Sequence, residues 1–429
     1  MSRTAFLNAR LVDPASGLDA PGGLLVEDGR IADFGPRLFQ DGRPADAEIV
    51  DCKGRVLAPG LIDMRVFTGE PGSEHRETLQ SASHAAAAGG VTTIIVMPNT
   101  DPVIDEPSLV DFIKRRAAAT ASVRVLPMAA LTRHLTGEVM TEIGLLMEAG
   151  AVAFTDGDRS VTNAQLMRRT LTYARDFDAL IVHHTEDPNL VGEGVMNEGE
   201  FAARLGLVGI PNAAEAVLLE RDMRLVALTG GRYHAASLSC IESLEILKRA
   251  REAGLAVSAS VSINHLTLNE NDIGPYRTFL KLSPPLRTED DRLALVAAVA
   301  SGLIDVVMSD HNPQDVEVKR LPFAEAASGA IGLQTMLPAA LRLIHNGDMD
   351  FKTLIRATST RPAELLGLPG GTLRAGAPAD LIVIDADIPW VLDPSDLKSQ
   401  CKNTPFDEAR FSGRVVRTIV GGRTVYEHV

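Results

Sequence analysis

The chain has 429 residues, too many for a typical small domain, and its 45% hydrophobic and 23% charged residues are typical of a soluble protein with a full core. Aromatic residues make up only 4%, so the core must be mainly aliphatic. The net charge of −14 excludes nucleic acid and anionic membranes as partners that are bound through general electrostatics.

The cysteines and the apolar runs indicate the compartment. Cys52, Cys240 and Cys401 are odd in number and far apart, which excludes a disulfide framework and a Cys-x-x-Cys metal site. The first ten residues have no apolar signal segment, and no run of about 18 apolar residues occurs. We therefore expect a cytoplasmic protein that does not span a membrane.

Both ends of the chain predict short strands separated by turns. Asp28-Gly29 and Gly421-Gly422 are hairpin signals, each between two apolar or alternating runs. The strands are expected at residues 5–12, 23–26 and 30–34, and again at 380–385, 413–420 and 423–427. This pattern predicts one small β-sandwich domain built from residues 1–57 and 366–429.

Between the two ends, apolar strands alternate with segments of helical period. Strands are expected at residues 61–67, 91–97, 123–128, 151–155, 180–185, 232–237, 256–261 and 305–309. Helices are expected, among others, at 140–149, 163–175, 242–253 and 289–301. Eight such units predict an α/β fold, a (β/α)8 TIM-type barrel over residues 58–365. The alternative is a doubly wound open sheet, but no Gly-rich nucleotide turn or Walker pattern supports it.

Polar residues recur at the predicted carboxyl ends of the strands, where such barrels carry their chemistry. They fall within residues 63–67, 97–100, 155–158, 183–186, 234–239 and 309–313. Taken singly, each has an ordinary structural explanation, such as a helix cap or a hydrogen-bonded core histidine. Taken together, they predict a functional site.

Several motifs, in order along nearly the whole chain, resemble those of bacterial dihydroorotases in the amidohydrolase superfamily. They include Pro59-Gly60-Leu61-Ile62-Asp63-Met64, Met97-Pro98-Asn99-Thr100, His184-Thr185-Glu186-Asp187, Ser309-Asp310-His311-Asn312-Pro313 and Gly332-Leu333-Gln334-Thr335. The resemblance implies the barrel and composite β domain already predicted. It also implies a reaction, the reversible ring closure of carbamoyl aspartate to dihydroorotate, at two metal ions, usually zinc, that hold a hydroxide.

The resemblance implies six metal-ligand positions, and only His184 and Asp310 keep the expected residue. Asp310 is also the family's proton-transfer position. The other four are replaced: a His-x-His pair by Arg65 and Phe67, an Asp by Gly157 and a His by Ser237. Asp156 and Asp158 flank Gly157, so a shifted register could partly restore that ligand.

Neighbouring histidines are poor substitutes. His183 adjoins His184 on a strand, and His234 lies an odd three residues before Ser237, so both should point away from the site. A weak mononuclear site at His184 and Asp310 stays open as an alternative, which a cationic Arg65 would oppose. Our hypothesis is that Arg65 occupies the former metal space and pairs with Asp310 or with Asp156, and zinc is expected to be absent or weakly bound.

The substrate positions have changed as well. Gly69 stands where the resemblance implies a carboxylate-binding arginine, and Gln314 where it implies a histidine. Asn99 is kept. We expect Asn99 and Gln314 to be the remaining substrate-binding residues, without the strongest charge-assisted contact to an anionic substrate.

Three functions remain open. The first is a non-catalytic dihydroorotase homologue of pyrimidine biosynthesis that serves aspartate carbamoyltransferase as a structural or regulatory subunit, in a homo- or hetero-oligomer. The second is an active cyclic amidohydrolase, a dihydroorotase or a hydantoinase-like relative, that acts on dihydroorotate or carbamoyl aspartate with a rebuilt site. The third is a sensor that binds a pyrimidine precursor through Asn99 without turnover.

Overall fold

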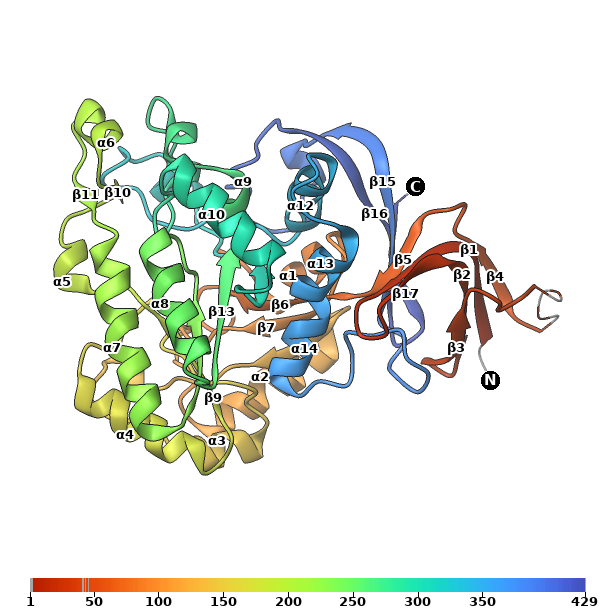
Figure 1. Cartoon of the computed structure of the whole chain (residues 1–429), viewed down its shortest axis with the longest axis horizontal. Coiled ribbons are helices and arrows are strands. Elements are labelled where there is room, and N and C mark those ends of the chain that lie inside the picture. Colours follow the sequence, from red (N-terminus) through yellow and green to blue (C-terminus); the bar gives the residue numbers. More distant parts are fainter. Residues whose placement is uncertain (1–2, 41, 43, 45, 429) are drawn as a thin grey trace.

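The computed structural model describes residues 3–40, 42, 44 and 46–428, and it contains a (β/α)8 barrel and a smaller β domain, as predicted. The barrel and its helices form the larger body in Figure 1, and the β domain projects from one side of it. Strands from both ends of the chain lie together in the β domain. No helix in this described part is long and apolar enough to cross a membrane.

The β domain is one eight-stranded sheet in the order β17-β16-β15-β5-β1-β2-β3, with β4 paired to β1. Its strands are β1 (Arg3–Asp13), β2 (Leu18–Glu27), β3 (Arg30–Gly35), β4 (Glu48–Asp51), β5 (Val56–Pro59), β15 (Leu381–Val391), β16 (Arg410–Val420) and β17 (Arg423–Glu427). Leu11, Leu57 and Leu381 belong to a separate core that this sheet encloses. β5 spans the predicted domain boundary between residues 57 and 58, and the predicted boundaries stay a prediction.

The barrel wall has strands at all eight predicted positions. Seven are regular: β6 (Leu61–Val66), β7 (Val91–Val96), β8 (Arg124–Pro127), β9 (Leu180–His184), β12 (Arg232–Ala236), β13 (Val257–Ser262) and β14 (Val306–Met308). The fourth, at residues 151–155, is irregular: it forms isolated bridges from Phe154 to Ala129 and to Ile181, and backbone hydrogen bonds tie it to both neighbouring strands. A bridge between Val66 and His311 joins the last strand to the first and closes the wall. The open-sheet alternative is therefore wrong.

Helices cover the outside of the wall, and local sequence signals set their ends. The longer ones are α1 (Leu79–Ala88), α2 (Pro107–Thr120), α3 (Ile143–Ala149), α4 (Ala164–Arg175), α7 (Ala213–Thr229), α8 (Ile241–Glu252), α10 (Glu289–Ala300) and α12 (Met336–His345). Asn163 caps α4, and Thr288 with Asp291 forms a capping box on α10. The helix predicted from residue 140 begins three residues later because Met140 pairs with Thr132 in a β-bridge.

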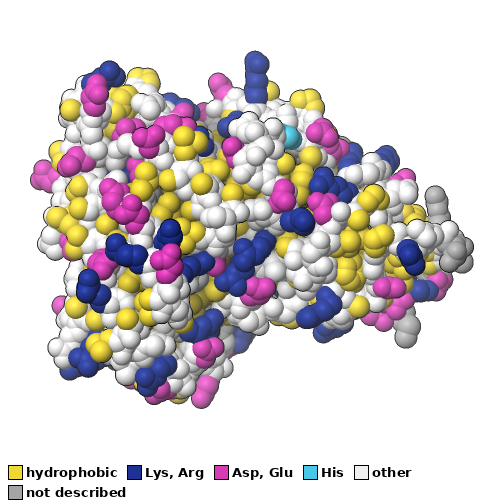
Figure 2. Space-filling view, in the orientation of Figure 1, with side chains coloured by type: hydrophobic (Ala, Val, Ile, Leu, Met, Phe, Trp, Pro, Cys, Tyr) yellow, Lys and Arg dark blue, Asp and Glu magenta, His cyan; other side chains and the backbone are white. Residues whose placement is uncertain are grey.

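Shorter helices occupy the loops and the end of the barrel. They are α5 (Pro188–Val191), α6 (Glu200–Leu205), α9 (Ile263–Thr267), α11 (Val316–Lys319), α13 (Phe351–Ile355) and α14 (Arg361–Leu366), and the two-residue strands β10 (Met196–Asn197) and β11 (Gly209–Ile210) lie among them. On the face in Figure 2, side chains of both signs are interspersed over these elements.

The barrel interior is a packed apolar layer. Met64, Ile95, Met128, Val182 and Val306 form one buried cluster inside the wall. A cavity of only about 10 Å³ remains there, roughly enough for a single water molecule. The interior therefore leaves no room for a ligand, and a functional site is expected at the carboxyl ends of the strands, above this layer.

Candidate functional site

Arg65 lies at the end of β6 and is buried among carboxylates. It is 4% exposed. Its Nε donates a hydrogen bond to Asp310 Oδ1 over 2.9 Å, and its Nη2 makes a short contact with Asp158. Asp310 follows β14 and Asp158 follows the fourth strand, so three strand ends converge on one guanidinium.

The charges at this site are interdependent. Burial raises the pKa of Asp310, and nearby Asp158 adds to this effect, while Arg65 and His184 oppose it. Burial opposes the charge of Arg65, but Asp158 and Asp310 raise its pKa overall. The guanidinium therefore stays protonated and is held by the two carboxylates. It also compensates their negative charges, which would otherwise be unfavourable in this buried position.

The predicted pair of Arg65 with Asp310 is confirmed, but the alternative partner was wrong. Asp156 turns its carboxylate to the backbone, where Oδ1 accepts hydrogen bonds from Leu131 N (3.0 Å) and Thr132 N (2.8 Å). Its Oδ2 accepts a hydrogen bond from the Thr132 hydroxyl. Asp156 therefore fixes the loop after β8, and Asp158 is the second partner of Arg65.

The other three replaced positions, Phe67, Gly157 and Ser237, are all buried. Phe67 is 2% exposed, and the Arg76 guanidinium lies 4.1 Å above its ring centre. Gly157 has φ +68°, and a Cβ there would lie 3.2 Å from the side chain of Asn99. Ser237 has φ +58°, and its buried hydroxyl has no partner in the described part of the chain.

His184 is engaged by protein groups. Its Nε2 donates to Glu186 Oε2 over 2.9 Å, and Ser283 donates to the same carboxylate oxygen over 2.7 Å. Burial would raise the pKa of Glu186, but the hydrogen bond and charge of His184 lower it overall. His184 Nδ1 is buried without a partner among the described residues.

His183 points away from the site, as predicted, but the same prediction for His234 was wrong, because His234 points into the barrel interior and lines the small cavity there. His183 points outward, where its Nε2 accepts Val161 N (2.8 Å) and its Nδ1 bonds Asp222 (2.7 Å). Because Nε2 is an acceptor, Nδ1 must be the donor. His234 lies within the barrel, with Nδ1 2.8 Å from Ser258 Oγ, and burial lowers its pKa to about 4.

These residues do not fit a binuclear zinc centre. Within the described ranges, no group of three or more His, Cys, Asp or Glu side chains is arranged to hold a metal ion. The buried cation of Arg65 occupies the space between the two carboxylates that such a centre would use. A metal ion there would have to displace a guanidinium that both carboxylates hold.

The predicted substrate residues differ in availability. Asn99 Oδ1 is buried and has no hydrogen bond within the described chain, so it is a free acceptor. Gln314 Nε2 donates to Asn312 Oδ1 (3.1 Å) and to Ser328 O (2.8 Å). Donation to a substrate, as predicted, would require breaking one of these bonds.

Sequence reasoning missed a link between the β domain and this site. The segment between β15 and β16 extends over the barrel, and Ser399 contacts Glu77 beside His311, which is fully buried. His311 Nε2 lies 3.3 Å from Glu77 Oε2. Only the position of His311 next to Asp310 hinted at a role, and nothing in the sequence pattern indicated Ser399.

Comparisons with known proteins agree with the fold and with the resemblance. A family model described as "Dihydro-orotase-like" matches residues 54–243. A solved L-hydantoinase (dihydropyrimidinase) from Arthrobacter aurescens has a TM-score of 0.89 at 26% identity, covering 100% of this chain and 96% of that one. A solved D-hydantoinase, 22% identical with a TM-score of 0.85 over 99% and 95% of the chains, shows the shared fold alone.

Two relatives found by sequence are more similar to this chain than these two solved structures are. "Dihydroorotase" of Ehrlichia chaffeensis is 42% identical over 425 residues, 99% of this chain and 95% of the relative. "Dihydroorotase" of Syntrophotalea carbinolica is 42% identical over 419 residues, 98% of each chain. With this identity over nearly its whole length, the chain belongs to the dihydroorotase family.

Proposed function

We propose that this chain is a non-catalytic member of its family, which acts in pyrimidine biosynthesis as a structural or regulatory partner of aspartate carbamoyltransferase. The observation that carries the proposal is Arg65, buried between Asp158 and Asp310 where the resemblance places the first metal ligand. A guanidinium neither lowers the pKa of a bound water nor acts as a Lewis acid in the way that zinc does.

The substrate side supports the same proposal. An anionic substrate needs a cationic partner, and the position of the family's arginine is Gly69. Arg65 is not a replacement, because its side chain is 5% exposed and its Nε and Nη2 are already bound to carboxylates. A chain that has lost catalysis but keeps the complete barrel needs another reason to keep that fold. A role as a structural or regulatory subunit supplies one.

Metal content and turnover test the loss of catalysis. We expect protein purified without chelator to contain far less than one zinc ion per chain, and to form no dihydroorotate from carbamoyl aspartate with added zinc. The matched control is the dihydroorotase of Syntrophotalea carbinolica, prepared and assayed in the same way. Near-stoichiometric zinc with turnover would overturn the proposal.

The partner is tested separately. The chain, co-expressed with the aspartate carbamoyltransferase of its own organism, is expected to elute with it as one complex in size-exclusion chromatography. The complex should still form with Arg65→Lys, because a buried residue of the barrel does not contribute to an exposed contact. Separate elution at micromolar concentration of both proteins would refute this part of the proposal alone.

The alternative is an active dihydroorotase with a mononuclear metal site at His184 and Asp310. It is favoured by 42% identity over 99% of the chain to proteins named dihydroorotase. It requires Arg65 to leave Asp310 when metal binds. Turnover that depends on zinc and disappears in Asp310→Ala would establish it in place of our proposal.

A further inference from the structure

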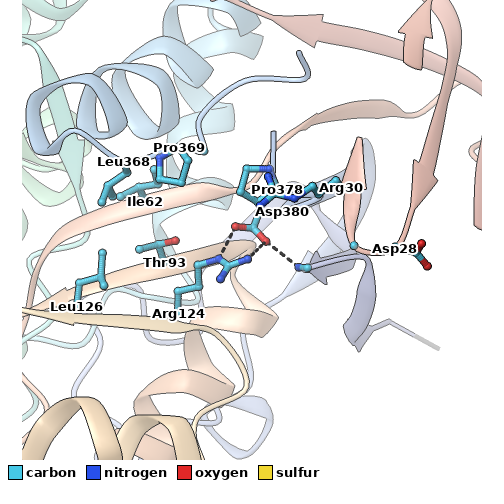
Figure 3. Close-up of a pocket in the computed structure, with 13 residues that line it drawn as sticks. Asp28, Arg30, Ile62, Thr93, Arg124, Leu126, Leu368, Pro369, Pro378 and Asp380 are labelled. Carbon is cyan, nitrogen blue, oxygen red and sulfur yellow. Dashed lines mark hydrogen bonds and ion pairs between the residues drawn. The ribbon is translucent and has the colours of Figure 1, made fainter. Parts of the chain in front are cut away.

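A cavity of about 540 Å³ lies at the opposite end of the barrel from Arg65. It is enclosed by the first residues of β6, β7 and β8 on one side and by the β domain on the other (Figure 3). Small-molecule sites commonly have this size and occur at domain junctions. The family's chemistry belongs to the other end of the strands, so this cavity has no part in it.

One wall of the cavity is apolar. Ile62 and Leu126 project from the barrel strands, and Leu368 and Pro369 follow α14. Leu126 and Leu368 are only partly buried, although they pack against the apolar layer of the barrel interior. This wall offers contact area to a ring or a short alkyl chain.

The facing wall carries an ion pair with spare donors. Arg124 donates through Nε (2.6 Å) and Nη2 (3.1 Å) to Asp380, which also accepts Gly421 N (2.7 Å). Arg124 Nη1 has no partner in the described part of the chain, and the side chain is 45% exposed. Arg30 also lines the cavity, and the only hydrogen bond that its side chain makes among those residues goes from Nη1 to Gly376 O.

The charge in the cavity is therefore positive. Arg30 and Arg124 contribute two cations, and Asp380, whose side chain is 7% exposed, contributes one anion that is already satisfied. The fourth charged residue, Asp28, points its carboxylate away from the cavity in Figure 3. The two arginines favour a ligand of negative charge, although the net charge of −14 on the whole chain opposes it.

A hydroxyl on the cavity wall is a second, independent indication of a ligand. Thr93 is 4% exposed and lines the cavity, and its hydroxyl makes no hydrogen bond to any described residue. Figure 3 shows this hydroxyl directed toward Arg124 and Asp380. The hydroxyl reaches the cavity and has no partner among the described residues, so it is available to donate a hydrogen bond to a bound acceptor.

We propose that this cavity binds a small amphipathic carboxylate. Its apolar body packs on Leu126, Leu368 and Pro369, and its carboxylate accepts hydrogen bonds from Arg124 Nη1 and the Thr93 hydroxyl. The site lies between the barrel and the β domain, so its occupancy would tighten that junction.

Binding is tested by titration calorimetry on the full chain with benzoate and hexanoate, which separate a ring from an alkyl chain. We expect at least one to bind with a Kd on the order of 0.1–1 mM. Benzyl alcohol lacks the charge and acetate lacks the apolar body, and each should bind at least roughly tenfold more weakly. The proposal would be overturned if neither carboxylate bound at about tenfold the upper expected Kd, or if benzyl alcohol and acetate bound as tightly as the two carboxylates.

A variant that fills the cavity locates the binding. Gly370 lines the cavity, a Cβ there meets nothing within 4 Å, and its φ is not positive, so Gly370→Phe should fold. It is expected to weaken binding at least roughly tenfold, and Thr93→Val to weaken it several-fold. Gly199→Phe lies beside α6, where a Cβ would meet only Asn197 Nδ2 at 3.9 Å, and this matched control should bind as the parent does. Unchanged binding by Gly370→Phe would place the ligand elsewhere and refute the site.

Discussion

The Arg65→Met variant is expected to have a free energy of unfolding about 3–5 kcal/mol below that of the parent chain. Removing the guanidinium leaves Asp310, whose side chain is 10% exposed, without its cation and beside a second carboxylate, Asp158. Uncompensated buried charge is among the few causes of so large an effect. Urea denaturation followed by circular dichroism measures it.

Restoring the charge balance should restore stability. Asn in place of Asp310 keeps the shape and removes the charge, so Arg65→Met/Asp310→Asn should recover at least half of the loss. Arg204→Met is the surface control, because Arg204 and Glu200 form an exposed pair worth well under about 1 kcal/mol. A loss in Arg65→Met no larger than in the control would mean that the guanidinium is not what holds the two carboxylates.

Most of the fold could be predicted because it follows from local patterns. The eight strand positions of the barrel were each marked by an apolar run, and hairpin signals such as Asp28-Gly29 marked the β domain. The errors occurred where tertiary contacts override the pattern. Met140 continues the helical period of α3 but is extended in a bridge to Thr132.

The site was predictable only where strand geometry fixes it. Arg65 and Asp310 both end strands of a closed barrel, so their proximity followed from topology. The pairing with Asp158 did not, because the chain turns at Gly157 with φ +68°, so Asp156 and Asp158 do not face the same way as they would on a regular strand. Ser399 meets Glu77 across 322 residues of sequence, a contact that no local pattern encodes.

Gly69→Ala is expected to lower the free energy of unfolding by at least about 2 kcal/mol, although it adds only a methyl group. Gly69 has φ +67°, where L-residues are disfavoured, and its Cβ would lie 2.4 Å from Ser73 O and 2.7 Å from Glu77 O. Those atoms are backbone, and Ser73 N donates to Gly69 O over 2.5 Å in the same turn. The turn therefore cannot yield as a side chain would. Thermal or urea unfolding gives the loss directly.

Gly54→Ala separates strain from collision, because Gly54 has φ +81° but nothing within 4 Å of its Cβ position. It should lose only about 1 kcal/mol. If Gly69→Ala loses no more than Gly54→Ala, the turn after β6 is adaptable, and Gly69→Arg would then be a feasible way to return a substrate cation to the site. If the larger loss is found, the arginine cannot be restored by one substitution. The backbone after β6 would then exclude the side chain that an anionic substrate needs, and recovery of catalysis would require rebuilding this turn together with the Arg65 position.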